Sequence, residues 1–152
     1  MAITPKHVFG FAKEQELQSI LEEHVGEALV KTEWRFDAID WRGAAWDVEL
    51  KSRLRLDKYG KLQMPTSFKT WVLPATKVDI AAHTDRPTRY YYFWDADQSL
   101  WWMDYKEVDW ESLVRGVPPW HTEEHYYVPR ELWHAVGLKR PQEQRTGRWV
   151  AQ

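Results

Sequence analysis

The stretch FDAIDWRGAAWDVELKSR, residues 36–53, decides the fold predicted for this chain. Apolar and aromatic residues recur on both sides of Gly43, a pattern that favours two extended, half-buried strands. Arg42, Gly43 and Ala44 supply a turn, so the stretch is predicted to be a β-hairpin with a three-residue loop. The rest of the sheet is expected to assemble on this hairpin.

The predicted hairpin brings two acids and a lysine together. With the loop centred on Gly43, Asp37 lies opposite Glu49. Glu49 and Lys51 share a face because side chains alternate along a strand. Two opposed carboxylates repel each other, and a hard divalent cation between them relieves the repulsion. The pattern therefore favours an Mg2+ or Mn2+ site at Asp37 and Glu49, with Lys51 holding a phosphate or an attacking water, which suits phosphodiester hydrolysis.

Two other interpretations of the hairpin stay open. An Asp-x-Glu-x-Lys pattern is also typical of a strand face that is exposed to solvent and carries charged side chains without a functional role. A slip in register would move the three groups apart. Asp40 is the rival for the first acid. In the predicted register, however, Asp40 faces Trp46 near the turn, and its side chain points away from that of Asp37.

The acid in FDAID, the short hairpin and the Glu-x-Lys of VELK resemble the core of the PD-(D/E)XK nuclease superfamily, which has the restriction-endonuclease-like fold. The order of the flanking segments, from a glutamate-bearing helix to two later strands, extends the resemblance over residues 9–110 and is similar to small viral and phage members. Arg35-Phe36 stands where a proline often precedes the first acid, so the match rests on Asp37, Glu49 and Lys51. The resemblance implies an α/β domain with a central mixed sheet flanked by helices in the order αβββαβ.

The same resemblance implies further site residues. The Leu50 carbonyl would be an extra metal ligand, and Lys77 would contact a phosphate. A glutamate on the first helix would orient a metal-bound water or serve a second ion. Glu14 is preferred over Glu16 because, with Gly10, it reproduces a Gly-x-x-x-Glu setting. Either glutamate is equally an ordinary first-turn acid favoured by the helix dipole.

The remaining segments complete the predicted architecture. Helices are predicted at residues 9–25, 74–82 and 129–136, strands at 28–35, 89–94 and 100–105, and a short capped turn at 109–116. Residues 53–73 lack a sustained period and are predicted to be a long mobile loop, whose basic residues Arg53 and Arg55 would close over a substrate. The tail from about residue 141 is polar.

Composition limits the class of protein. The 152 residues fit one domain, without cysteines for disulfides or thiolate zinc sites. No membrane span or secretion signal is evident, so a cytoplasmic protein is expected, in the host-cell interior if the source is viral. The 11 tryptophans exceed what a small core needs, so several are expected on a surface. The net charge is −2, yet residues 51–89 hold nine Lys/Arg against three Asp/Glu, a basic block suited to a nucleic-acid backbone.

The sequence HTEEH, His121 to His125, matches the His-x-x-Glu-His motif of zinc proteases in its residue types and spacing only. The flanking prolines leave too little helix to hold two histidines on one face, so a polar loop is the expected structure.

These features favour a divalent-metal-dependent nuclease. DNA is preferred over RNA as the partner, an endonuclease over an exonuclease, and a homodimer stays open. Two other classes are kept: a non-catalytic module of the same fold that binds nucleic acid or protein, and, less favoured, a tryptophan-rich carbohydrate-binding module.

Overall fold

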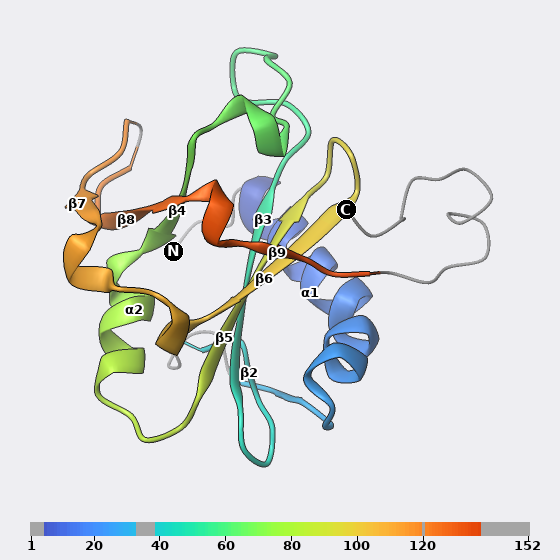
Figure 1. Ribbon diagram of the computed structural model, residues 1–152. Coiled ribbons are helices and arrows are strands. Elements are labelled where there is room, and N and C mark those ends of the chain that lie inside the picture. Colours follow the sequence, from blue (N-terminus) through green and yellow to red (C-terminus); the bar gives the residue numbers. More distant parts are fainter. Residues whose placement is uncertain (1–4, 33–38, 120, 138–152) are drawn as a thin grey trace.

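The computed structural model describes residues 5–32, 39–119 and 121–137. Over these residues the chain forms a mixed α/β fold with two α-helices and two β-sheets (Figure 1). This confirms the predicted fold class at the level of a mixed sheet flanked by helices. The predicted polar tail lies outside the described residues.

The first helix, α1 (Pro5–Val25), begins before the predicted residue 9 and ends where the sequence predicts. Gly26 follows with φ of +91°, a left-handed conformation that favours glycine. The Gly26 amide still donates to the Glu22 carbonyl oxygen at 2.9 Å, which closes the last turn. Leu17 and Leu21 are fully buried and fix the face that α1 presents to the sheet.

The larger sheet has six strands in the described part of the chain, in the order β1-β2-β3-β5-β6-β9. These strands are β1 (Val30–Lys31), β2 (Trp41–Arg42), β3 (Asp47–Arg53), β5 (Thr88–Trp94), β6 (Ser99–Asp104) and β9 (His134–Ala135). The pair β3 and β5 is parallel, and the other pairs are antiparallel. The sheet is therefore mixed, as predicted, and the predicted hairpin of residues 89–105 is confirmed in β5 and β6.

A smaller sheet and the second helix cover the other side. The smaller sheet pairs β4 (Thr70–Pro74), β8 (His125–Pro129) and β7 (Val114–Gly116) in that order. Helix α2 (Ala75–Ala82) starts directly after β4 and confirms the predicted helix at 74–82. In Figure 1, α1 lies on one side of the larger sheet, and α2 lies with the smaller sheet on the other.

Alternation along β5 divides the apolar residues between two cores. Tyr91 and Phe93 pack with Leu17 and Leu21 of α1. Tyr90, Tyr92 and Trp94 belong to the second core, which is shared with β4, β8 and α2. Such a strand is buried on both faces, which is why its sequence reads as an unbroken aromatic run.

The prediction that several tryptophans line a surface is wrong for the residues described, where none is fully exposed. Of the eight tryptophans within those residues, five are buried, and the remaining three are only partly exposed. The buried ones are Trp41, Trp71, Trp94, Trp110 and Trp133. Several pack edge to face or stacked in the second core, as Trp71 does with Trp94 at a centroid separation of 5.0 Å.

The predicted register of the 36–53 hairpin is wrong. Trp41 pairs with Val48 and Arg42 with Asp47, and the loop is closed by the Gly43 amide donating to the Trp46 carbonyl oxygen at 2.8 Å. The loop is thus longer than the predicted three residues. The predicted first strand, 28–35, is observed only as the short β1, and residues 33–35 lie outside the described part.

Two later predictions are also corrected. Residues 53–73 are not a structureless loop: they contain the end of β3, a bridge between Leu56 and Leu62, the 3-10 helix η1 (Pro65–Ser67) and the start of β4. Residues 129–136 are not an α-helix but the end of β8, the 3-10 helix η4 (Arg130–Leu132) and β9. Residues 109–116 form a 3-10 turn, η3 (Trp110–Ser112), as expected, followed by β7; a further turn, η2 (Tyr105–Glu107), follows β6.

The two helices bear on the question of a membrane span. Within the residues described, neither helix combines the length and the apolar character that a membrane span requires.

Candidate functional site

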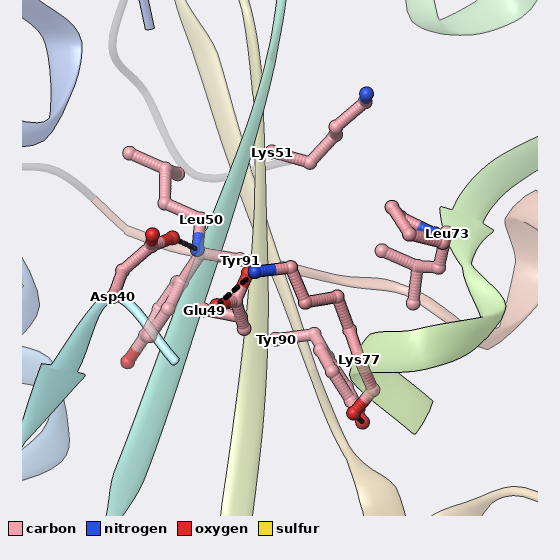
Figure 2. A pocket seen from close by; sticks show the side chains of 9 residues that line it. Asp40, Glu49, Leu50, Lys51, Leu73, Lys77, Tyr90 and Tyr91 are labelled. Carbon is pink, nitrogen blue, oxygen red and sulfur yellow. Dashed lines mark hydrogen bonds and ion pairs between the residues drawn. The ribbon is translucent and has the colours of Figure 1, made fainter. Parts of the chain in front are cut away.

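A cavity of about 180 Å³ lies where β3 and β5 of the larger sheet meet β4 and the start of α2 (Figure 2). Charged side chains reach it from three directions: from the segment before β2, from β3 and from α2. Its lining residues are Asp40, Glu49, Leu50, Lys51, Leu73, Pro74, Lys77, Tyr90 and Tyr91. It therefore gathers several of the residues that the sequence singles out.

Glu49 lies at the centre of this cavity. Its neighbours in the strand, Val48 and Leu50, pack in the core beneath α1, so alternation directs Glu49 to the opposite face. The side chain is buried, and Lys77 Nζ donates to Glu49 Oε1 at 3.2 Å. Burial raises the pKa of Glu49 well above its ordinary value, and the negative charge of Asp40 raises it further, while Lys77 opposes both effects.

Asp40 supplies the second carboxylate of the cavity. It immediately precedes β2, and one step beyond the observed Trp41–Val48 pair brings position 40 opposite position 49. The Leu50 amide donates to Asp40 Oδ2 at 2.9 Å. The Asp40 carboxylate therefore accepts a β3 backbone hydrogen bond that a carbonyl of a neighbouring strand would otherwise accept. Asp40 therefore holds the position that the predicted register assigned to Asp37, and Asp37 itself lies outside the described residues.

Glu14 approaches the same region from α1. Its Oε1 lies 2.5 Å from Lys31 Nζ, and the same ammonium is 3.8 Å from Asp40 Oδ1. Burial raises the pKa of Glu14 to about 7, with a further contribution from the charge of Asp40. Glu16, the alternative helix acid, is exposed and pairs with Lys13 at 3.0 Å. The structure thus brings Glu14, and not Glu16, next to Asp40.

The two candidate lysines differ in their relation to Glu49. Both line the cavity. Figure 2 shows Lys77 reaching from α2 to Glu49, whereas the ammonium of Lys51 points away from that pair. The lysine predicted to contact a phosphate, Lys77, is therefore the one that contacts the buried acid. Lys51 shares the face of β3 with Glu49, as alternation predicts.

The two arginines predicted to bind substrate have different environments. Arg53 Nε donates to Tyr92 Oη at 3.2 Å, and Arg53 Nη1 donates to Gln63 Oε1 at 3.3 Å. Its guanidinium also lies 5.1 Å from the ring centroid of Phe68. Arg53 therefore anchors the segment that follows β3. Arg55 is exposed on that segment and does not line the cavity.

The arrangement of possible metal ligands bears on the predicted ion site. Among the side chains that the structure describes, no group of three or more His, Cys, Asp or Glu is arranged to hold a metal ion. The HTEEH segment also lacks zinc-protease geometry, because His125 is a buried residue at the start of β8 and not part of a helix. Asp40 and Glu49 are the two carboxylates among the residues that line the cavity.

The chemical character of the site follows from these contacts. Burial, and then the charge of Asp40, raises the pKa values of Glu14 and Glu49, while Lys31 and Lys77 oppose these shifts. Clustered acids with raised pKa values in a cavity are typical of sites that bind a cation or transfer a proton. Asp40 is the rival that the sequence offered for the first acid, and the predicted register wrongly placed it opposite Trp46; the signal for its true place is its position immediately before the strand that pairs with β3.

No protein-family model, no curated protein and no solved structure matches this chain. The function of the site is therefore inferred from its own geometry and chemistry.

Proposed function

We propose that this protein is a divalent-metal-dependent nuclease that hydrolyses phosphodiester bonds, with DNA preferred over RNA and internal cleavage preferred over removal of ends. The observation that carries the proposal is that Asp40, just before β2, and Glu49, in β3, line one cavity together with Lys51 and Lys77. Opposed carboxylates are costly unless a cation joins them. Adjacent ammonium groups suit an anionic substrate.

The donor atoms fit Mg2+ or Mn2+. Mg2+ is usually held by one or two carboxylates, with waters and substrate phosphates completing its coordination. Asp40 and Glu49 would supply the carboxylates, and the Leu50 carbonyl, in the backbone between Glu49 and Lys51, would be a third ligand. When bound, the ion would lower the pKa of a coordinated water and polarise a phosphoryl oxygen.

The lysines would act on the substrate rather than on the ion. Lys77, which pairs with Glu49 at 3.2 Å, would exchange that partner for a phosphate oxygen once a cation neutralises Glu49. Lys51 would hold the attacking water or the phosphate on the other side of the cavity. Glu14, through its contact with Lys31 at 2.5 Å, would hold that lysine near Asp40 and order the acid end of the site.

The order of elements supports the same proposal. Helix α1 is followed by β1, β2 and β3, then by α2 and by β5, which is parallel to β3. This order is compatible with the αβββαβ core that the resemblance implies, with β4 added before α2. It also brings α2 next to β3, where Lys77 pairs with Glu49 at 3.2 Å.

The test is cleavage of labelled single-stranded, duplex and four-way-junction DNA, and of matching RNA, with Mn2+, Mg2+ or EDTA. The wild type is expected to cut DNA with Mn2+ and to be inactive in EDTA. Glu49→Gln and Lys77→Met are each expected to slow cleavage about 100-fold, because each removes charge stabilisation at the reacting phosphate.

Exposed residues provide matched controls. Glu111→Gln and Lys106→Met make the same chemical changes at exposed positions away from the cavity and are expected to keep full activity. Thermal unfolding of all four variants separates loss of activity from loss of structure. A wild type that cuts none of the nucleic acids, or a Glu49→Gln variant with wild-type rates, contradicts the proposal.

A non-catalytic module that binds nucleic acid or protein is the second candidate. It is favoured by the ion pairs of Lys31 with Glu14 and of Lys77 with Glu49, which compensate buried charge without a metal. Such a module would bind nucleic acid in the same experiment without cutting it, and Mn2+ would leave its binding unchanged. Carbohydrate binding receives no support, because most tryptophans within the described residues are buried.

A further inference from the structure

A small hairpin follows β3 and is held in one conformation by its own backbone. We call residues 54–62 the prong. Asp57 and Lys61 close its tip through the Asp57 amide, which donates to the Lys61 carbonyl oxygen at 2.8 Å. Asp57 Oδ1 accepts the Tyr59 amide at 2.8 Å and the Lys61 amide at 2.9 Å. Gly60, with φ of +79°, makes the sharp turn between them.

The base of the prong is anchored to the sheet. Gln63 is buried, and its side-chain amide donates to the Leu54 carbonyl oxygen at 3.0 Å. The Gln63 backbone amide donates to the Arg55 carbonyl oxygen at 2.8 Å. Arg53, at the end of β3, donates to the Gln63 side-chain oxygen at 3.3 Å and lies over Phe68. The prong therefore has a defined position relative to the strand that carries Glu49.

The surface of the prong combines apolar and basic side chains. Tyr59 is 67% exposed, and Leu56 and Leu62 are 47% and 50% exposed. The basic side chains Arg55, Lys58 and Lys61 are exposed as well, and Lys58 Nζ lies 5.5 Å from the centroid of the Tyr59 ring. The acid of the prong, Asp57, directs its carboxylate to backbone amides. Figure 1 shows this segment, between β3 and β4, standing clear of the sheets at the top of the view.

We propose that the prong binds unpaired nucleotides of the substrate strand, with Tyr59 stacking on a base and Lys58 and Lys61 contacting the flanking phosphates. This inference rests on the proposed nuclease function, since it assigns the kind of strand that enters the site. Nucleic acid matches both features of this surface. Its phosphates are anionic and suit the basic side chains, and its bases have flat π-faces that suit the Tyr59 ring. In a duplex those faces are covered by stacking, so the prong selects single-stranded regions.

The place of the prong along the chain supports this assignment. An extended strand rises about 3.3 Å per residue, so Arg53, where β3 ends and the prong begins, lies roughly 13 Å from Glu49 along the strand. A strand held by Tyr59 would therefore run from the prong along β3 toward the cavity, on the side where Lys51 follows Glu49. The fixed tip also reduces the conformational entropy that a flexible loop would lose on binding.

The test is fluorescence anisotropy with labelled single-stranded DNA and with blunt duplex DNA, in EDTA so that no cleavage occurs. Tyr59→Ala is expected to weaken single-strand binding about tenfold, the loss typical of one stacked base, and Tyr59→Phe is expected to restore it. The double variant Lys58→Gln, Lys61→Gln is expected to lower the slope of log affinity against log salt by about 1.4. Lys106→Gln is the matched control and is expected to bind as the wild type does.

The outcomes separate this inference from the nuclease proposal. Equal single-strand affinities for wild type and Tyr59→Ala overturn the role of the prong, even if the protein cuts DNA. An equal loss on single-stranded and blunt duplex DNA overturns the selection of unpaired nucleotides. Binding that depends on Tyr59, in a protein that cuts no nucleic acid with any metal, supports the prong and contradicts hydrolysis.

Discussion

Glu14 illustrates how the site depends on single side chains. Burial raises the pKa of this carboxyl to about 7, the charge of Asp40 adds to the effect, and Lys31 opposes it. A raised carboxyl pKa means that the folded protein holds a proton that the unfolded chain has already released. The same charge that makes the site attractive to a cation is thus unfavourable for folding when no cation is bound.

This electrostatic cost predicts a pH dependence of stability. Because the folded pKa of Glu14 exceeds its ordinary value of 4.5, its contribution to stability is present below that value and is lost as the pH rises through about 7. Between about pH 5 and pH 8 the wild type is expected to lose on the order of 1 kcal/mol more unfolding free energy than Glu14→Gln. Urea denaturation at both pH values in EDTA measures this difference, with the exposed Glu16→Gln as control. Identical pH dependence in wild type and Glu14→Gln would refute the assignment.

The sequence identifies some site residues better than others. Strand alternation alone places Glu49 on the face that Lys51 shares, whereas Glu14 and Lys77 are selected only through the family resemblance, and all three lie in or next to the cavity. Asp40 is not placed correctly, since its position opposite Glu49 depends on the exact register of a hairpin. A shift in register moves a different acid to the position facing a given residue.

At the scale of elements, the turn between β2 and β3 sets that register through distant partners. Glu27 Oε2 accepts the amides of Ala45 and Trp46 at 2.9 and 3.0 Å. Arg86 Nη2 donates to the carbonyl oxygens of Gly43 and Trp46 at 2.7 and 3.2 Å. A Cβ atom at position 43 would collide with the Glu27 carboxylate, so a larger residue there would displace the side chain that accepts the two turn amides. None of these contacts is visible in residues 36–53 alone.

Arg86 also predicts a measurable contribution to stability. Its Nε donates to Asp47 Oδ1 at 2.7 Å, and the side chain of Asp47 is only 3% exposed. Arg86→Met would leave the buried carboxylate with the weaker contact to Arg42 at 3.5 Å and would free two turn carbonyls. We expect a loss of about 2 kcal/mol in the free energy of unfolding, measured by chemical denaturation.

A surface arginine gives the comparison for this prediction. Arg115 pairs with Asp79 at 3.1 Å, and both side chains are more than a third exposed. Arg115→Met is expected to change the free energy of unfolding far less than Arg86→Met does, because solvent screens an exposed ion pair. Equal losses for Arg86→Met and Arg115→Met would show that Arg86 does not hold the turn.

Other elements show the same limit on sequence-based prediction. Helix α2 and the hairpin of β5 and β6 are predicted correctly because their signals are local: a proline before a helical stripe, and two aromatic runs joined by a short polar turn. The segment 129–136 is assigned wrongly to a helix because its conformation is decided by pairing of β8 with β4 and of β9 with β6. Such long-range pairing outweighs a short helical pattern.

At the scale of the whole molecule, the cavity lies where the larger sheet, the smaller sheet and α2 meet. The two cores pack on both faces of β5, and the first core also packs on β3, which is paired with β5 along its length, so Glu49 projects from a strand held within the sheet. The lysine that contacts it comes from the far side of this junction, on α2. The site is therefore assembled only when both layers have packed, which favours a precise geometry over a mobile one.

The central claim is that Asp40 and Glu49 share one divalent cation. Its most direct test is a titration of Mn2+ into the protein without nucleic acid, with free Mn2+ measured by electron paramagnetic resonance. The wild type is expected to bind one ion saturably, Asp40→Asn and Glu49→Gln to bind it at least about tenfold more weakly, and Glu111→Gln to bind as the wild type does. Absence of saturable binding by the wild type, or unchanged binding by both cavity variants, would contradict the claim.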